Sequence, residues 1–396
     1  MRDDVRAASI RPLAAGIAAT TAVALPTLLV GGLSVLIQRD LDFGEAELGS
    51  AIATAFIGAA LVAVPAGRLA ERYGPRAVVL AGLASAAASL VGIGALASSS
   101  LTLAAFLVLA GIAVTLVQVG VNVILARLVS AEHQGLAFGA KQAAVPLASL
   151  LAGLALPVIG VTLGWQAAFL IAAAAIPIIA LAMPDAPRPT AERQAAARNG
   201  GGSSRALYLL ALGALLGSAG GNSTPAFIVA SSADRGLGFT EAGLVLSAGS
   251  LVGIVARVGS GWIADRLGRG SLLLVAGLLG IGTIGFIVLA VADHPALIFL
   301  GSALAFGGGW GWGGLLALAV SRSQQGGIGR AMGIVQVGPM AGAVVGPFLF
   351  GMLAERFSFT AGWLALAGLA TAAALTFLAA RREILREREA AGEAAG

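Results

Sequence analysis

The chain of 396 residues contains no cysteine and only two histidines, His133 and His294. Without cysteine it can form no disulfide, no thiolate metal site and no thiol nucleophile. Both histidines fall between apolar runs, which excludes a buried imidazole cluster. No aspartate pair or histidine-rich motif suggests catalysis either. We therefore expect no metal, no cofactor and no enzymatic activity.

Charged residues are also scarce, at 11% of the chain, whereas hydrophobic residues make up 58%. The mean hydropathy is +0.94, which is too apolar for a soluble domain of this length and indicates a lipid bilayer as the solvent. The isoelectric point is 10.8. However, the 24 basic and 19 acidic residues are spread between apolar runs and form no basic patch, so nucleic acid is not an expected partner.

A segment in lipid must satisfy its own backbone hydrogen bonds, so each long apolar run predicts a membrane-spanning helix. The runs predict an all-α membrane protein with twelve transmembrane helices in two pseudo-symmetric six-helix bundles. The first run is too long for a cleaved signal peptide and is predicted to be a retained span. The predicted spans are 12–37, 46–67, 77–97, 101–126, 135–161, 164–183, 206–231, 241–264, 271–291, 295–320, 328–354 and 359–380.

Residues 184–205 interrupt the apolar runs with prolines, four arginines and a glycine-serine stretch. Such a composition is typical of a flexible linker. The predicted domains are therefore an N-terminal bundle (1–183), a linker (184–205) and a C-terminal bundle with a short charged tail (206–396).

The arginines indicate how the chain is oriented. With an even number of spans, 19 arginines fall on the side of the two termini and three, Arg39, Arg235 and Arg356, on the other. Cytoplasmic loops are enriched in positive charge. Both termini and the linker are therefore predicted to be cytoplasmic.

Two charged phrases are repeated 194 residues apart, and each follows a long apolar run. The first contains Gly67, Glu71, Arg72, Gly74 and Arg76, and the second contains Gly261, Asp265, Arg266 and Gly268. A second pair of segments, beginning at Gly135 and Gly329, has the same offset. Two agreeing offsets of about half the chain indicate a duplicated membrane protein with a site between its halves.

The repeated phrase resembles the loop signature between the second and third spans of the major facilitator superfamily, which usually has aspartate in place of Glu71. The resemblance covers essentially the whole chain. It implies two six-helix bundles that rock about a central cavity, with the first, fourth, seventh and tenth spans lining it. A carboxylate beside an arginine at a helix end can form charge-assisted bonds in one conformation and lose them in another. The signature residues are thus predicted to form a conformational latch.

Two ionisable residues lie within predicted spans, Lys141 in the fifth and Arg257 in the eighth. A charge at membrane depth is costly unless it faces a cavity or a partner, so both are candidate substrate-binding residues. The aligned positions in the other half are Val335 and Ala63, so the duplication does not account for either cation. The structural alternatives stay open: Lys141 is close enough to the cytoplasmic side to reach the interface, and Arg257 could bond to backbone carbonyls.

Asp and Glu are absent from the middle of every predicted span, so two buried cations without a nearby acid predict an anion site. The absence also disfavours efflux of cationic drugs and leaves proton coupling to Lys141, to the substrate or to nothing. Anion exchange and facilitated diffusion stay open. Neutral side chains that complete the candidate site are Gln118, Asn122, Gln142, Asn222, Gln336 and Trp312, with Trp310 as a further candidate for the cavity wall. The alternative role for the amide side chains is hydrogen bonding between neighbouring helices.

A looser resemblance concerns the fifth span around Lys141, Gln142 and Pro146 and the eighth span around Arg257. It is to the bacterial branch that carries cyanate and other small anions. An arginine in the eighth span also occurs among monocarboxylate and oxalate carriers.

The predicted function is therefore a secondary transporter of a small organic or inorganic anion, monomeric and in the bacterial inner membrane. A proton or counter-anion is a candidate co-solute. Efflux of hydrophobic compounds is the alternative, suggested by the apolar, glycine-rich interior.

Overall fold

The structure is a computed structural model. It describes residues 2–129, 137, 140–185, 205–267, 271–313, 315–316, 319–320 and 328–390. All regular elements in these ranges are helices, as expected for backbone that must pair its own polar groups in lipid.

In the described part of the N-terminal half, nine helical elements have defined bounds, and three of them lie in the fifth span. They are α1 (Arg2–Gly32), α2 (Ser34–Leu41), α3 (Glu45–Tyr73), α4 (Pro75–Leu96), α5 (Ser100–Leu128), α7 (Ala144–Ala155), η2 (Leu156–Gly160), α8 (Val161–Leu163) and α9 (Trp165–Ala182). The element η2 is a wider, π-helical turn at Pro157 within the fifth span, Ala140–Leu163.

The described part of the C-terminal half follows the same order of long antiparallel helices. Its elements are α11 (Arg205–Asp234), α12 (Phe239–Leu267), α13 (Ser271–Val291), α14 (Pro295–Leu304), η3 (Ala305–Gly309), α16 (Ile328–Arg356) and α17 (Phe359–Ala390).

Within the described residues, eleven helices are long and apolar enough to cross a membrane. The predicted tenth span is the one that differs, because its first α-helix ends at Leu304, continues as the π-helical turn η3 and is then interrupted by a turn at 310–312 before helical residues follow at 313, 315–316 and 319–320. The cause is visible in the sequence, since Gly307, Gly308 and Gly309 lie together and glycine weakens a helix interior. The chain is therefore an all-helical, multi-pass membrane protein, with a π-helical turn in its fifth span and a π-helical turn followed by a break in its tenth.

The turn between α3 and α4 explains one part of the repeated phrase. Gly74 has φ = +91°, a conformation that side-chain-bearing residues rarely adopt. Pro75 follows at the first position of α4, where its missing N–H costs nothing. Gly74 and Pro75 together reverse the chain within two residues.

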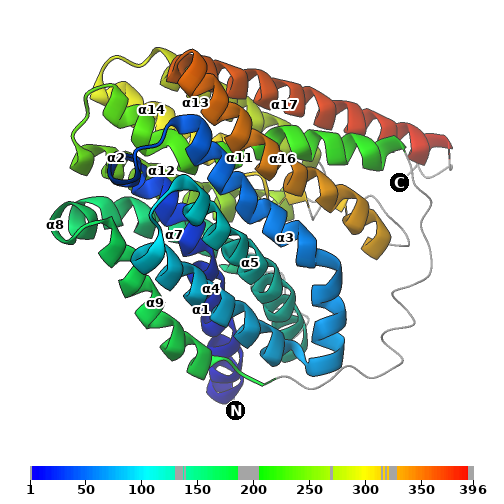
Figure 1. The fold of residues 1–396 in the computed structure, drawn as a ribbon. Coiled ribbons are helices and arrows are strands. Elements are labelled where there is room, and N and C mark those ends of the chain that lie inside the picture. The colour runs from blue at the N-terminus through cyan, green and yellow to red at the C-terminus, as the bar shows by residue number, and fades with distance from the viewer. Residues whose placement is uncertain are drawn as a thin grey trace.

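Figure 1 shows most helices of the N-terminal half in the lower part of the view, with α16 and α17 running across its upper part towards the right. Because the long helices alternate in direction, their ends define two faces. We call the end that carries residues 73–75, 182 and 205 the linker face. The opposite end, which carries residues 42–44, 164, 236 and 357, is the far face.

The apolar core differs between these two faces. One cluster runs through the N-terminal half and continues into the far-face ends of the C-terminal helices, where it includes Phe227, Leu246 and Phe350. A separate cluster, which includes Leu207 and Phe377, packs the linker-face ends of the C-terminal helices. Among the described residues the halves thus share a core near the far face and have separate cores near the linker face.

Candidate functional site

Lys141 lies one turn before α7 and is buried, with 3% of its surface exposed. Its Nζ donates a hydrogen bond to Asn122 Oδ1 at 2.8 Å and another to Gln118 Oε1. Both acceptors are on α5, the fourth span, at positions one helical turn apart. The ammonium is therefore held by two neutral oxygens, an arrangement that stabilises the charge without neutralising it.

Arg257 lies on α12 and is bound by backbone carbonyls from two different spans. Its Nε and Nη2 donate to the carbonyl oxygen of Trp310 at 3.2 and 3.1 Å, and its Nη1 donates to the carbonyl oxygen of Gln142 at 2.9 Å. The guanidinium carbon also lies 5.0 Å from the centre of the Trp310 ring, within cation–π range. Gln142 follows Lys141 directly in the chain, so the half-buried Arg257 bonds to the backbone of the residue next to the buried lysine.

The bond to Trp310 depends on the irregular tenth span. Trp310 follows η3 directly and is part of a turn, so its carbonyl is available outside a regular α-helical ladder. Irregular backbone at membrane depth is tolerated where it is buried in protein or lines a cavity. The glycine-rich segment thus supplies an acceptor that an uninterrupted helix would use itself.

Neither cation has an acidic partner in the described part of the chain. Every hydrogen bond of Lys141 and Arg257 ends on an amide oxygen of a side chain or of the backbone. A guanidinium also carries more N–H groups than the three bonds of Arg257 use. Within the described residues each cation therefore keeps its positive charge uncompensated, and Arg257 has donors to spare, which suits an anion. No group of three His, Asp or Glu side chains among the described residues could hold a metal ion.

The remaining predicted binding residues lie elsewhere. Asn222 Nδ2 donates to the carbonyl and to the hydroxyl of Ser218, both at 2.9 Å within α11. Gln336 is exposed on α16. Trp312 is buried, donates to the carbonyl of Gly309 at 2.9 Å and packs against Phe377 in the second apolar cluster. The structure therefore brings together Lys141, Gln118, Asn122 and the backbone of Gln142 with Arg257, and it places Trp310 rather than Trp312 against the guanidinium.

The predicted latch residues of the first repeat lie on the linker face. A side chain at Gly67 would meet no atom within 4 Å. Glu71 is exposed, and the exposed Arg72 lies over the ring of Tyr73 at 5.3 Å. Arg76 Nη1 is 3.9 Å from Asp185 Oδ2, at the start of the linker. In this conformation Glu71 has no ion pair among the described residues.

The second repeat is described only in part. Gly261 is on α12, and a side chain there would meet no atom within 4 Å. The side chains of Asp265 and Arg266, together with the whole of Gly268, lie outside the described residues. Their part in a latch stays a prediction.

The halves meet most closely near the far face. On the α7–α12 pair, a β-carbon at Gly153 would lie 2.6 Å from the carbonyl oxygen of Gly243, so only glycine allows this approach. On the α3–α16 pair, Glu355 Oε2 accepts a hydrogen bond from the backbone N–H of Ala46 at 2.8 Å. The far face is therefore closed by direct contacts between the halves.

Along α7 and α12 the contacts continue toward the linker face as hydrogen bonds between the two helices, which we call rungs. The hydroxyl oxygens of Ser149 and Ser250 are 2.7 Å apart, and Ser247 Oγ lies 3.2 Å from the carbonyl oxygen of Leu150. The bond between Arg257 and Gln142 is the rung of this pair that lies nearest the linker face. The cation pair thus sits where the closed part of the interface ends.

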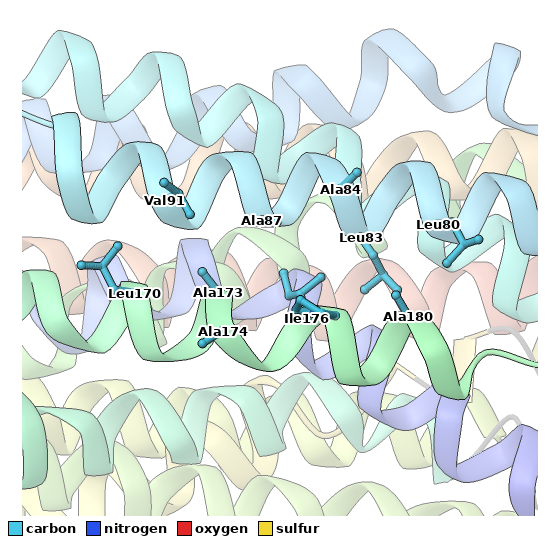
Figure 2. A pocket seen from close by; sticks show the side chains of 11 residues that line it. Leu80, Leu83, Ala84, Ala87, Val91, Leu170, Ala173, Ala174, Ile176 and Ala180 are labelled. Carbon is cyan, nitrogen blue, oxygen red and sulfur yellow. The ribbon is translucent and has the colours of Figure 1, made fainter.

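An apolar groove lies away from these residues, between α4 and α9 (Figure 2). Its volume is about 440 Å³, and it is lined by aliphatic side chains such as Leu83, Leu170 and Ile176. Because no charged group lines it, the groove has no means of orienting an ion, and it stands apart from the candidate site.

Comparison with known proteins decides the family. The family model described as the Major Facilitator Superfamily matches residues 13–292 and 209–395. The chain belongs to the major facilitator superfamily. It is similar to monocarboxylate transporter 11 of Homo sapiens, with 33% identity over 374 residues that cover 86% of this chain and 79% of that protein.

Solved structures of other transporters share the fold of this superfamily member. A bacterial homologue of the human lysosomal transporter Spinster, in an inward-facing and occupied conformation, has a TM-score of 0.76 and 16% identity. The alignment covers 94% of this chain and 97% of that one. A D-xylose-proton symporter has a TM-score of 0.74 and 16% identity, over 93% and 97% of the two chains. The relatives are transporters, and the chain is therefore a transporter of the major facilitator superfamily.

Proposed function

We propose that this transporter carries a small organic anion of the monocarboxylate class by alternating access. The observation that carries the proposal is that Lys141 is buried and that Arg257 bonds to the carbonyl of the next residue, Gln142, at the end of the closed interface, with no acidic partner for either cation among the described residues. A carboxylate matches the planar donors of a guanidinium, and the ammonium adds a mobile point charge. The similarity to a monocarboxylate transporter supports the same class of solute, and the proposal includes the small-anion porter branch of the superfamily.

The proposed architecture has twelve spans in two six-helix bundles, residues 1–183 and 206–396, joined by the linker 184–205. Eleven described helices and the shorter apolar helix Pro295–Gly309 support this number. Both termini are proposed to face the cytoplasm of a bacterial cell, because most of the arginines lie on the linker face. A single chain supplies both cations, so a monomer is sufficient.

In this proposal the conformation described here opens toward the cytoplasm. The shared core and the Gly153–Gly243 approach close the far face, whereas the linker-face ends have separate cores. The likeness in fold to an inward-facing transporter is consistent with this assignment. An anion enters from the linker face, binds the spare donors of Arg257 beside Lys141, and is released on the other side after the far-face contacts part. Glu71, exposed here, then pairs across the linker face and latches it.

Coupling in this mechanism does not use an acid buried at the site. The anion can be carried in its protonated form, or a proton can be carried on Lys141. Exchange for a second anion is the remaining route. The cost of leaving two cations without a counter-ion favours return of the carrier with an anion bound.

A ligand-stabilisation screen of the purified protein tests the proposal. The panel contains formate, acetate, pyruvate, oxalate, cyanate, nitrate and phosphate, together with hydrophobic drug-like compounds as the alternative class. A true ligand raises the melting temperature by binding only the folded state. We expect small carboxylates to raise it in the unmodified protein and in Arg39→Gln, which changes an exposed arginine on the far face. We expect no rise in Arg257→Gln. If Arg257→Gln keeps the same response as the unmodified protein, or if only hydrophobic compounds stabilise it, the anion assignment is wrong.

A further inference from the structure

The acceptor that Arg257 uses on the other half is a backbone carbonyl, and the sequence determines why it is free. In a continuous helix the carbonyl of Gln142 would accept a hydrogen bond from the N–H four residues later, at position 146. That residue is Pro146, which has no N–H. The regular helix α7 starts only at Ala144, after a turn at Ala143 whose N–H bonds to Ala140. The Gln142 carbonyl is thus left without a helical donor.

Arg257 takes the bond that the proline leaves open. Its Nη1 lies 2.9 Å from the Gln142 oxygen and is the donor of a charge-assisted hydrogen bond. The bond crosses from one half to the other, whereas the two bonds to Trp310 stay within the C-terminal half. It is also the rung on the α7–α12 pair that lies nearest the linker face. A single carbonyl therefore ties the two halves together at the candidate site.

We infer that Pro146 is a positioning residue for transport: by freeing the Gln142 carbonyl, it gives Arg257 an internal acceptor that an entering carboxylate displaces. The inference rests on the proposed function, because it assigns the carboxylate as the competitor. An oxygen of the anion and the oxygen of Gln142 are alternative acceptors for the same N–H group. Binding of the solute then removes the tie between the halves, and the same step that fills the site loosens the closed interface.

This arrangement sets both affinity and response to the solute. An anion that must replace an existing bond binds less tightly than it would to an unoccupied guanidinium, because only the difference between the two bonds contributes. The energy used to displace the carbonyl appears as a change in the contact between the halves. The affinity for the anion is therefore lower than it would be without the competing carbonyl, and the difference shifts the conformational equilibrium.

The substitution Pro146→Ala isolates this effect. It restores the N–H group at position 146, so the Gln142 carbonyl can bond within its own helix and no longer needs Arg257. Because the chain has no cysteine, spin labels can be placed at chosen sites without a background. Exposed positions on the linker face, Ala77 on α4 and Leu385 on α17, report the separation of the halves when both are changed to labelled cysteine.

In detergent or nanodiscs without added anion, we expect Pro146→Ala to broaden the Ala77–Leu385 distance distribution. Arg257→Gln removes the donor of the same hydrogen bond, so it should broaden the distribution in the same way. Gln142→Ala keeps the backbone carbonyl and should leave the distribution as it is. Pro177→Ala is the matched control, since it also restores an N–H inside a helix, in α9, but far from Arg257.

The second measurement uses acetate as the probe. We expect Pro146→Ala to bind acetate about fivefold more tightly, the size expected from losing one competing hydrogen bond, and Arg257→Gln to lose binding. In proteoliposomes the KM for acetate should fall in Pro146→Ala without a matching rise in kcat. A purely structural role of Pro146 would change stability and kcat but would not lower KM.

The two measurements separate the inference from the function on which it rests. If Pro146→Ala and Arg257→Gln both keep the unmodified distance distribution, the tie does not act between the halves and the inference is wrong, whatever acetate does. If both broaden it and no carboxylate binds the unmodified protein, the tie stands and the carboxylate as its competitor is overturned. If acetate binds equally tightly with and without Pro146, the competition is overturned.

Discussion

The far face and the linker face are built from the same helices but are packed differently. At the far face, glycines and hydroxyls let α7 and α12 touch backbone to backbone, and one apolar core passes through both halves. At the linker face, a side chain at Gly67 or Gly261 would meet nothing, and each half has a core of its own. The difference shows that closure in this molecule requires small residues at defined contacts, and that charges are located where those contacts end.

The largest expected effect comes from preventing closure of the far face. Gly153→Leu places a side chain where the carbonyl of Gly243 lies, so α7 and α12 cannot approach as they do here. We expect transport in proteoliposomes to fall at least about tenfold, because a cost of a few kcal/mol in one conformation removes it from the cycle. Spin labels on the far face, at Ser98 and His294, should move apart.

The matched control for this change is Gly368→Leu on α17. A side chain at Gly368 would meet no atom within 4 Å, so the substitution adds the same bulk without touching the other half. Equal losses of transport in the two variants would mean that the leucine, rather than the Gly153–Gly243 approach, is responsible.

A smaller effect is expected from neutralising the buried ammonium. Lys141→Met fills a similar volume and removes a charge that is held only by Gln118 and Asn122. We expect the melting temperature to rise, since burying an unpaired cation is costly, and the affinity for the carboxylate identified in the screen to fall about tenfold. Thermal unfolding and a binding titration on the same sample measure both. A fall in melting temperature with unchanged affinity would assign Lys141 a structural role.

The smallest effect is expected from the hydroxyl rung of Ser149 and Ser250, whose oxygens are 2.7 Å apart across the interface. A hydrogen bond of this kind contributes about 1 kcal/mol, so either alanine substitution should shift the conformational equilibrium about fivefold away from the closed far face. The double variant should shift it no further than the larger single change, because both remove the same bond. Additive shifts in the distance distribution of far-face labels would contradict this rung.

Much of the fold was predictable because lipid allows the backbone so few solutions. The predicted spans correspond to the described helices wherever apolar residues run without a break, and the interruption of the tenth span has its signal in a run of glycines. The prediction placed both cations within spans, and the structure brings them to neighbouring sites. Their role in binding stays a prediction, as do the count of twelve and the latch.

The parts of the site that sequence reasoning missed are backbone groups. A sequence states each side chain directly, whereas an unpaired backbone carbonyl can be inferred only from a residue that is unable to donate a hydrogen bond to it. Pro146 was the available signal for Gln142, since a proline inside a span leaves the carbonyl four residues earlier without a donor. For Trp310 the signal was the preceding glycines. The choice between Trp310 and Trp312 depends on how an irregular turn points its side chains, which no periodicity determines.

Arg235 shows what an arginine with a purely local role looks like in the same molecule. It donates to the carbonyls of Leu289 and Ala290, both in its own half at the end of α13, and burial lowers its pKa. Arg257 uses the same chemistry across the two halves. Bonding to carbonyls is therefore no argument against function, because what matters is whether the acceptor moves relative to the donor.

The positions aligned with the two cations, Val335 and Ala63, are apolar. The two halves of such a carrier are related by an axis along the membrane normal, so each half contributes a cation from a different position and the site has no internal symmetry. We expect the affinity for the solute to differ between the conformations that open to the two sides of the membrane. Half-saturation measured from the two sides of oriented vesicles should therefore differ, although the net flux must still vanish at equilibrium.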